Sequence, residues 1–439
     1  MTIQVHAVRT YEEQLERLGK LTARTVPRLA SGRSAFFKDV SAWYNGFGEK
    51  KPNRYVVPPD PSYVLIFPYP RDDMSLGVTT AGALVTNAQL AAIAERYRLS
   101  LPLLQQQTRT LSGGERLLVA LAKAAVSQSA VDGLVLCSPT RWLFRQNFCC
   151  LELVAAEYHR AGKSVDVITL EGELLPATFG NGAAQTPLPT AVDPVVPTEP
   201  TEPSVRWALR FDEMVVEFPG TDYPVVSPPK RIVYALQQPS LQIESPTLLV
   251  GDNGIGKSTF AKVLTGQLRS RTRRPAVESR GTSGSTRCVF QDSLDQLFGE
   301  SIRQHMDRVF RFDSDGKKRA TAAFEEMQAA LVAALADDGV LIGDRDEPNT
   351  VLQSKLALIA ERLASRPVLL ALDEPEWGLS RNAARALLTV VGQQATKNGT
   401  CLLIISHADD WWQGVARSTL QMVREASGVV RIGSVAHAT

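Results

Sequence analysis

The sequence predicts an α/β fold in which parallel sheets carry helices on both faces, and it predicts this fold twice along one chain. Short apolar runs typical of buried strands alternate with helical patterns such as residues 115–125. The strand-like runs are residues 134–137, 165–170, 369–373 and 402–407. Several segments of the two halves also match each other, as an internal duplication would produce.

A phosphate-binding loop is the most specific motif of the chain. Residues 251–259 follow the apolar run 246–250 and fit the pattern G-x-x-x-x-G-K-[ST]. The loop consists of Gly251, Asp252, Asn253, Gly254, Ile255, Gly256, Lys257, Ser258 and Thr259. Glycines let backbone N–H groups turn toward a polyphosphate, Lys257 offers a positive charge, and Ser258 offers a hydroxyl for Mg²⁺. Strand context and full spacing favour a nucleoside triphosphate site over a chance glycine-rich turn.

Composition and charge exclude several classes of protein. The chain has 439 residues, 44% of them hydrophobic, with a net charge of +2, so no overall charge favours nucleic acid. There is no apolar run of about 18 residues, and the amino terminus lacks the layout of a signal peptide. The cysteines are odd in number and form no C-x-x-C pair. These features predict a globular protein of the reducing cytoplasm without a nucleic-acid partner.

A linker divides the two predicted domains. Residues 176–204 are rich in proline and small polar residues, which sustain neither helices nor sheet ladders. We therefore expect a first domain at residues 1–175, an extended linker at 176–204, and a second domain at 205–439.

The internal repeat is predicted from three aligned segments. Residues 256–266 align with 32–42, residues 289–298 with 66–75, and residues 368–375 with 133–139. This alignment sets Arg33 opposite Lys257 and Pro68 opposite Gln291. It also sets Leu170 opposite His407.

The second half carries residues suited to hydrolysis of the outer phosphate of a nucleoside triphosphate. Asp373 ends an apolar strand, where a carboxylate can hold Mg²⁺, and Glu374 follows as a candidate general base. Gln291 follows the strand-like run C-V-F and is a candidate contact of both Mg²⁺ and water. His407 ends another strand-like run, where an imidazole can contact the outer phosphate. Phe218 fits either an adenine-stacking role or an ordinary core position, and the sequence leaves both open.

The first half lacks these groups. Pro27 and Arg33 stand opposite Gly251 and Lys257 in the alignment, and Cys137 with Ser138 replaces the Asp-Glu pair. Neither metal binding nor base catalysis is expected from that set. The first copy is therefore predicted to be degenerate.

The first half nevertheless holds an anion-binding motif that the second half lacks. The residues Leu111-Ser112-Gly113-Gly114-Glu115 open a predicted helix, and a helix amino terminus with small residues favours anions. The matching stretch of the second half, residues 349–353, contains no glycine.

Together these motifs resemble the ATP-binding cassette (ABC) ATPases, a likeness that covers nearly the whole chain apart from the linker and the amino-terminal tip. In that family two cassettes face each other, and each ATP lies between the phosphate loop of one and the L-S-G-G-E signature of the other. The resemblance implies two ABC-type domains with β and helical subdomains, ATP and Mg²⁺ as cofactors, and a pseudo-dimer within one chain. One complete site would join the residues of the second half to Ser112–Glu115. The opposite site, residues 27–35 against 349–353, would be dead or would hold nucleotide without turnover.

Two departures from the family pattern stand out. The segment after Asp373-Glu374, usually S/T-x-G-L-D, is E-W-G-L-S at residues 376–380, so Ser380 stands where aspartate is usual. We expect altered communication between the sites. Few residues precede Arg33, so the first copy is expected to have a shortened β-subdomain.

A narrower resemblance is to the energy-coupling-factor ATPases, and residues 289–301 carry it. In those proteins the equivalent segment docks onto a transmembrane subunit. The docking residues would be Asp295, Gln296, Leu297 and Phe298. The alternative is ordinary packing within the helical subdomain. This likeness implies ATP-driven uptake of a small solute, vitamin or metal ion, with the chain peripheral on the inner face of the cell membrane.

Other functions stay open at this point. A soluble ABC ATPase of nucleic-acid metabolism, translation or defence is the main alternative. Against it, no coiled-coil insertion interrupts either half, and the linker is proline-rich rather than helical and charged. A regulator with negligible hydrolysis is a third possibility. The sequence names neither the solute nor the direction of transport.

Overall fold

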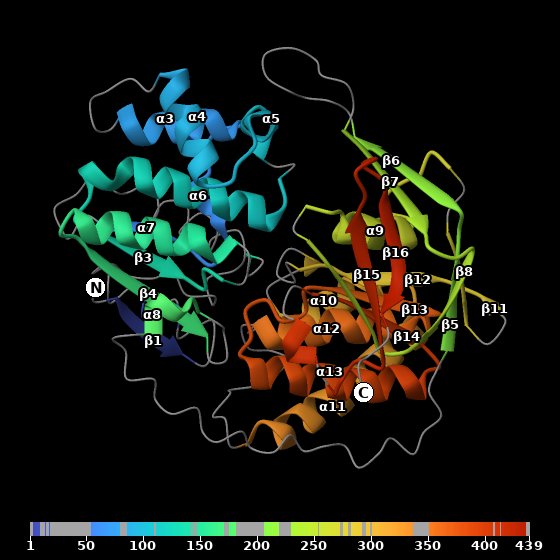
Figure 1. Ribbon diagram of the computed structural model, residues 1–439. Helices are drawn as coiled ribbons and strands as arrows, with labels where there is room; N and C mark the ends of the chain where they lie inside the picture. The colour runs from blue at the N-terminus through green and yellow to red at the C-terminus, as the bar shows by residue number, and fades with distance from the viewer. Residues whose placement is uncertain are drawn as a thin grey trace. The chain divides into compact units, whose positions relative to one another are not determined.

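A computed structural model describes most of the chain (Figure 1). The described residues are 3–8, 14, 17, 54–79, 86–108, 111–140, 142–143, 147–170, 175–180, 206–218, 230–252, 254–272, 275–279, 282–291, 296–298, 301–336, 351–406, 409–412 and 414–435. They form two compact units, the first holding the described residues up to 180 and the second those from 206 onward.

The second unit is built on an eight-stranded sheet in the order β12-β13-β14-β9-β15-β16-β7-β6. Its strands are β6 (Glu213–Phe218), β7 (Lys230–Leu236), β9 (Thr247–Gly251), β12 (Thr286–Val289), β13 (Leu369–Asp373), β14 (Cys401–Ile405), β15 (Ser418–Arg424) and β16 (Val430–Val435). All neighbours from β12 to β15 pair in parallel, which confirms the predicted parallel core. Beyond β15 the sheet is mixed, because β15–β16 and β6–β7 are antiparallel.

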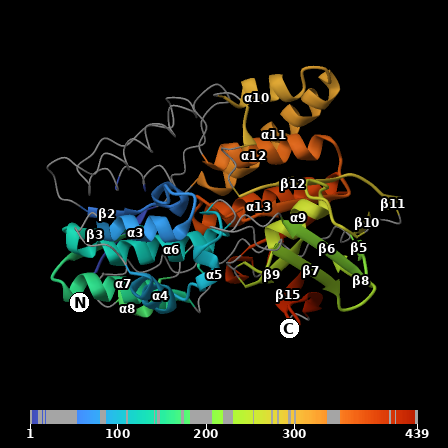
Figure 2. The same ribbon diagram turned by 90° about the horizontal axis from the view of Figure 1, so that it is seen from above.

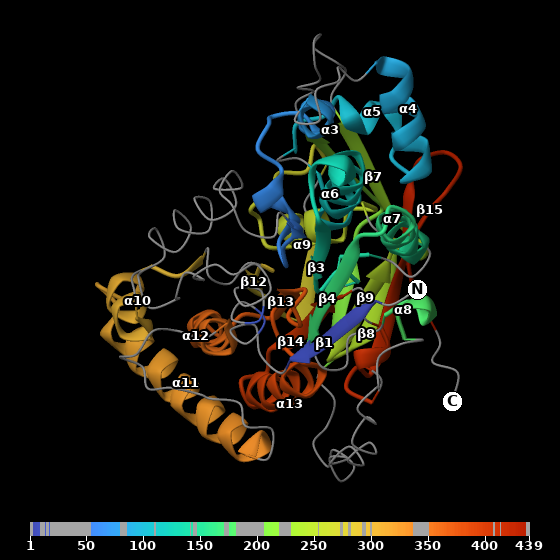
Figure 3. The ribbon, with the colours of Figure 1, turned by 90° about the vertical axis from the view of Figure 1, so that its left-hand side faces the viewer.

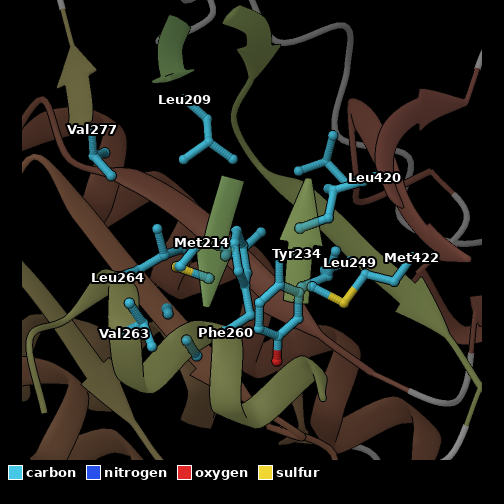
Figure 4. Packing of buried hydrophobic residues seen from close by; sticks show 14 of the residues in the cluster. Leu209, Met214, Tyr234, Leu249, Phe260, Val263, Leu264, Val277, Leu420 and Met422 are labelled. Atoms are coloured by element: carbon cyan, nitrogen blue, oxygen red, sulfur yellow. The ribbon is translucent and has the colours of Figure 1, made fainter. Parts of the chain in front are cut away.

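A second sheet covers helix α9 (Lys257–Leu264) from outside, and this is the β-subdomain. It is antiparallel, in the order β11-β10-β5-β8. Its strands are β5 (Arg206–Arg210), β8 (Ser240–Glu244), β10 (Ala276–Ser279) and β11 (Thr282–Ser283). Figure 4 shows the shared core, in which the rings of Phe260 and Tyr234 lie 5.6 Å apart among Met214, Leu249 and Leu264. Burial of these apolar side chains holds α9, and thus the end of the phosphate loop, in place.

The strands of the parallel core are buried on both faces, as their continuous apolar sequences predict. Alternate residues of β14, such as Cys401 and Leu403, belong to the core around α9. The intervening residues Leu402 and Ile404 are equally buried but lie outside that cluster. Helices α12 (Val351–Ala364) and α13 (Arg381–Lys397) pack on β12 and β14 and supply the other layer.

The helical subdomain of the second unit is formed by α10 (Ile302–Val309) and α11 (Ser314–Ala334) with α12. The long helix α11 packs along α12 and also contacts α13 (Figure 3). Figure 2 shows α10 and α11 on one side of this unit and strands β5 and β8 on another. The predicted β and helical subdomains are thus both present in the second copy.

The first unit has a four-stranded parallel sheet in the order β1-β4-β3-β2. Its strands are β1 (Gln4–Val8), β2 (Arg54–Val57), β3 (Gly133–Cys137) and β4 (Ser164–Leu170). Its helices are α3 (Pro70–Thr79), α4 (Asn87–Arg96), α5 (Leu101–Leu104), α6 (Gly113–Val126), α7 (Phe148–Arg160) and α8 (Ala177–Gly180), with 3-10 turns η2 (Pro61–Val64) and η4 (Ser127–Ala130). No antiparallel sheet is present among its described residues. Helix α6 confirms the helical pattern at residues 115–125, and it packs on α3, α7 and β2.

The two units repeat one strand order, β1-β4-β3-β2 in the first and β9-β14-β13-β12 in the second. The register fixes the correspondence. The N–H of Ser138 donates to the carbonyl of Ile168, and that of Glu374 donates to Ile405, both at 2.8 Å. Ile168 pairs with His6, and Ile405 with Leu249, so β1 corresponds to β9.

This register corrects the aligned pair of residues 32–42 with 256–266. Counting from His6 and Leu249, Val8 stands at the position of Gly251 and Gln14 at that of Lys257. The segment 32–42 itself lies outside the described residues. Strand β1 (Gln4–Val8) therefore corresponds to the strand before the phosphate loop, and residues 8–16, at the positions of 251–259, contain no glycine.

A second aligned pair, residues 66–75 with 289–298, is also wrong. Val57 pairs with Leu136 as Val289 pairs with Leu372, so Pro59 rather than Pro68 corresponds to Gln291. The pairing of residues 133–139 with 368–375 is confirmed by the same register.

The predicted linker begins later than residue 176. Residues Ala177–Gly180 form α8, and Phe179 is buried in the first unit because its aromatic ring needs an apolar environment. Residues 181–205 lie outside the described residues, so the extended linker there stays a prediction.

Candidate active site

The phosphate loop joins β9 to α9 in the second unit. Gly254 and Gly256 have φ angles of 70° and 108°, which side chains with a Cβ rarely adopt. A Cβ on Gly256 would lie 2.3 Å from Tyr234 Oη, the hydroxyl that donates to the Gly256 carbonyl at 2.7 Å. Only glycine therefore fits this turn. The helix that follows directs its amino terminus into the loop, as an anion site requires. Asn253 lies outside the described residues.

Lys257 is buried at the start of α9, and its ammonium group lies within the loop. Nζ donates to the carbonyls of Gly251 at 2.7 Å and Asp252 at 3.2 Å. Burial lowers the pKa of Lys257 to about 8, and the carboxylates of Glu374 and Asp373 oppose this shift. The positive charge is thus held in a poorly solvated loop, where its attraction for phosphate is strong.

Asp373 and Ser258 are brought together as the sequence predicts. Ser258 Oγ donates to Asp373 Oδ1 at 3.1 Å. Burial, together with the neighbouring Glu374 carboxylate, raises the pKa of Asp373 to about 7, and the hydrogen bond from Ser258 opposes the shift. A buried carboxylate with this shift favours a cation beside it.

Glu374 and Gln291 form the second predicted pair. Gln291 Nε2 donates to Glu374 Oε2 in a short hydrogen bond. Glu374 has a φ of 47°, a left-handed conformation that costs a residue with a side chain about 1–2 kcal/mol. Its N–H bond to Ile405 holds this conformation. The turn thus directs a buried carboxylate to the end of the strand, beside the glutamine.

The residues present fit a Mg²⁺ ion bound with a nucleotide. Ser258, Gln291 and Asp373 offer a hydroxyl, an amide and a carboxylate close to the phosphate loop, which are ligand types that Mg²⁺ prefers. No group of three or more His, Cys, Asp or Glu in the described part of the chain is arranged to hold a metal alone. An ion here would share its coordination with phosphate oxygens.

Glu376 belongs to this site, although sequence reasoning did not select it. It is buried, and Ser406 Oγ donates to its Oε1. Its charge also acts on Lys257. The available signal was a carboxylate at residue 376, where the family pattern has serine or threonine. Ser380, the other departure, caps α13 by accepting from the N–H of Ala383.

The first unit keeps the same strand-end turn without its carboxylates. Ser138 has a φ of 43°, and Gln14 Nε2 donates to Ser138 Oγ at 2.8 Å and to the Ile168 carbonyl at 3.1 Å. Gln14 is fully buried. An uncharged amide therefore occupies the place of Lys257 and is bound within the protein.

The L-S-G-G-E motif begins α6, as predicted. Ser112 is the N-cap, and Ser112 with Glu115 forms a reciprocal capping box. The Ser112 N–H and hydroxyl each donate to Glu115 Oε2 at 2.8 Å. Ser112 and Gly113 stay partly exposed, whereas Gly114 is buried. Binding of an anion at this terminus stays a prediction.

Of the two remaining predicted site residues, His407 and Phe218, the structure describes only Phe218. His407 lies outside the described residues, directly after the buried Ser406. Phe218 ends β6 and is partly buried against the core around α9. Its contact with adenine stays a prediction.

The predicted docking residues are not all at the surface. Leu297 is buried. The side chain of Gln296 accepts a hydrogen bond from the N–H of Phe290 and donates one to its carbonyl. Phe298 is 59% exposed and stacks on His305. Asp295 lies outside the described residues. Of the three described residues, Phe298 alone offers a large exposed apolar side chain.

The family that known proteins indicate for this chain fits the phosphate-loop site described above. Residues 236–376 match the family model described as ABC transporter. The second unit is therefore a phosphate-loop ATPase domain of the ATP-binding cassette class, for which ATP and Mg²⁺ are the cofactors. No helix among the described residues is long and apolar enough to cross a bilayer.

Relatives of known name are transporter ATPases. The energy-coupling factor transporter ATP-binding protein EcfA2 of Symbiobacterium thermophilum is 30% identical over 175 residues, covering 37% of this chain and 58% of that protein. The cobalt import ATP-binding protein CbiO of Rhodobacter capsulatus is 34% identical over 157 residues, covering 33% of this chain and 53% of that protein. The chain spans 50% to 62% of the length of such curated relatives.

Similar solved structures are tandem ABC proteins. An RNase-L Inhibitor structure is matched over 100% of this chain and 86% of that chain, with a TM-score of 0.55 and 15% identity. A model of ribosome-bound archaeal Pelota and ABCE1 is matched over 99% of this chain and 74% of that chain, with a TM-score of 0.59 and 14% identity. At these identities the likeness shows the fold alone, which is that of two ABC ATPase domains in one chain.

Proposed function

We propose that this chain is the ATP-hydrolysing subunit of an ABC transporter similar to the energy-coupling-factor systems, serving uptake of a small solute, vitamin or metal ion. One observation carries the ATPase part of the proposal. Lys257, the Ser258–Asp373 pair and the Gln291–Glu374 pair converge at a single phosphate loop. The named relatives of the second unit, which include a cobalt import ATPase, support the transport part.

In this proposal water would attack the outer phosphate in line. Glu374 would orient the water and accept its proton, and Gln291 would fix the carboxylate by its hydrogen bond. Lys257 would stabilise charge on the phosphate oxygens. Bound Mg²⁺ would neutralise phosphate charge, with Ser258, Gln291 and Asp373 as its protein contacts. Ser112, Gly113, Gly114 and Glu115 would complete the site across the internal pseudo-dimer.

One composite site per chain is part of this proposal. The first unit has Gln14 where a lysine would bind phosphate, and Ser138 where a base would stand. Neither side chain provides charge or a strong base. Hydrolysis would therefore occur only at the phosphate loop of the second unit, and its cycle of closure and reopening would move partner helices in the membrane.

The test of the transport role is co-purification of the tagged chain from its native host in mild detergent, with partners identified by mass spectrometry. We expect a polytopic membrane protein, with the chain on the cytoplasmic face. Phe298→Asp should lose that partner, because a charge would replace the exposed ring. Val423→Asp, at a half-exposed residue of β15, is the matched control and should keep it.

The soluble alternative has a distinct outcome. The tandem fold is similar to that of an RNase-L Inhibitor and to that in a model of ribosome-bound archaeal Pelota and ABCE1. Recovery with ribosomes or nucleic-acid proteins, unaffected by Phe298→Asp, would overturn the transport role. The ATPase proposal would be unaffected by that result.

A further inference from the structure

A buried tryptophan of the first unit packs directly against the first residue of helix α6. A Cβ built on Gly113 would lie 1.8 Å from Cε3 of Trp142, so any side chain at residue 113 would overlap the indole. Trp142 is 7% exposed, and its Nε1 donates to the Pro59 carbonyl at 2.5 Å. The ring is therefore fixed by packing on one side and by a hydrogen bond on the other.

The second unit has the corresponding contact between a helix start and the loop after the strand, but there the glycine is on the loop and the larger side chain is on the helix. Gly378 follows Asp373 at the same interval as Trp142 follows Cys137, and Val351 begins α12 as Gly113 begins α6. A Cβ on Gly378 would lie 2.8 Å from Val351 Cγ1. Gly378 has a φ of 75°, which disfavours a side chain, so the large residue is on the helix there.

The large residue therefore accompanies the L-S-G-G-E motif. In the first unit, whose helix begins with Gly113 and Gly114, the large Trp142 packs against the helix start. In the second unit, whose helix start has no glycine, the small Gly378 takes that place. Trp142 is buried against Gly113, while Ser112 and Gly113 are partly exposed. The indole thus supports the first turn of α6 and leaves both residues partly accessible. Pro59, the acceptor of the indole N–H, stands at the position of Gln291.

We propose that Trp142 is a positioning residue, which holds the first turn of α6 so that Ser112 and Gly113 can engage the bound nucleotide. This inference rests on the proposed function, in which that turn completes the ATP site. A displacement of donor groups by about 1 Å can lower a rate about 100-fold, because hydrogen bonds to the transition state depend steeply on geometry. Trp142 would therefore act on turnover, and the phosphate loop would still bind ATP without it.

The experiment compares Trp142→Ala, Trp142→Phe and Tyr97→Ala in the full chain. Tyr97 is another fully buried aromatic of the first unit, bonded to Glu157, and it controls for loss of stability. We expect Trp142→Ala to lower kcat roughly 10–100-fold at a temperature where all variants are folded, with fluorescent ATP analogue binding within about twofold of the parent. Trp142→Phe keeps a ring but loses the bond to Pro59, and a smaller loss of about 3–10-fold is expected. Tyr97→Ala should lower the Tm without lowering kcat.

The outcomes separate this inference from the function on which it rests. Ser112→Glu places a negative charge where phosphate is proposed to bind, and it should abolish turnover. If Ser112→Glu abolishes turnover and both Trp142 variants keep a kcat within about twofold, the positioning role is wrong. Should Trp142→Ala fail to fold, Trp142→Phe decides by the same criterion. Normal turnover in Ser112→Glu would instead refute the composite site itself.

Discussion

Ser138 and Glu374 occupy the same backbone turn in the two units. Their φ angles are 43° and 47°, and each N–H donates at 2.8 Å to an isoleucine carbonyl of the neighbouring strand. A left-handed conformation is uncommon for residues with side chains and persists only where the surroundings enforce it. The first unit therefore has the same turn without the carboxylate. The asymmetry between the units at this turn lies in the side chain and not in the backbone.

Glu374→Gln should slow ATP turnover roughly 10²–10⁴-fold while ATP still binds. The amide keeps the shape and the contact with Gln291 but cannot accept a proton. Steady-state phosphate release and equilibrium nucleotide binding measure the two effects. Glu326→Gln, at an exposed carboxylate of α11, is the control and should leave turnover unchanged. Unchanged hydrolysis in Glu374→Gln would remove the residue from the role of base.

Lys257→Ala and Gln14→Ala should differ strongly in their effect on activity, although the two residues occupy the same position in the two units. Lys257→Ala should abolish ATPase activity, because the phosphate charge is no longer matched. Gln14→Ala removes two buried hydrogen bonds, and we expect a stability loss of about 1–3 kcal/mol with little change in turnover. Steady-state phosphate release of both variants measures the difference. Equal losses of activity would contradict the model of a single hydrolytic site.

The contribution of Asp373 to the stability of the nucleotide-free protein should fall as the pH rises from about 4 to about 7. Burial raises the pKa of Asp373 from 3.8 to about 7, so the folded chain holds a proton that the unfolded chain releases earlier. The stability that this proton confers is complete below the unfolded pKa and is lost as the pH rises through the folded pKa. Denaturation curves of the parent and of Asp373→Asn over this range isolate the contribution. A slope shared by both proteins would assign the effect to other groups.

Gly113→Ala should destabilise the first unit by about 1–3 kcal/mol, because the new methyl group overlaps the Trp142 ring. In a Trp142→Gly background the same change should cost little, since the space is free. Gly392→Ala is the matched control, because a Cβ there meets nothing closer than 3.9 Å and a helix favours alanine. Thermal unfolding of the four variants measures the coupling. Equal costs of Gly113→Ala in both backgrounds would contradict the contact.

Local patterns in the sequence specified much of this molecule. The phosphate loop, the Asp373-Glu374 strand end and the capped helix at residue 112 depend on residues close in sequence, so their spacing is informative. The predicted strands at residues 134–137, 165–170 and 369–373 are present because buried parallel strands require continuous apolar runs. The ABC class followed from these motifs together.

Tertiary structure decided which residues of the first copy correspond to those of the second. Sequence similarity paired Arg33 with Lys257, whereas the strand register pairs Gln14 with it. Once the glycines and the lysine had been lost, no local pattern marked the old loop, and only the hydrogen bonds between strands preserved its position. Side-chain burial likewise decided that Leu297 is internal and Phe298 exposed, although the two are neighbours of similar hydrophobicity.

The same division explains Glu376 and Trp142. No motif marked Trp142 in the sequence, and Glu376 was visible only as a departure from the family pattern at residues 376–380. Glu376 gains its meaning from Ser406 on the next strand, and Trp142 from Gly113 at the start of a helix. The sequence by itself determined the fold class and the chemistry of one nucleotide loop, because both depend on short-range patterns. The correspondence of the copies and the packing behind the L-S-G-G-E turn depend on contacts between distant residues, which only the folded chain brings together.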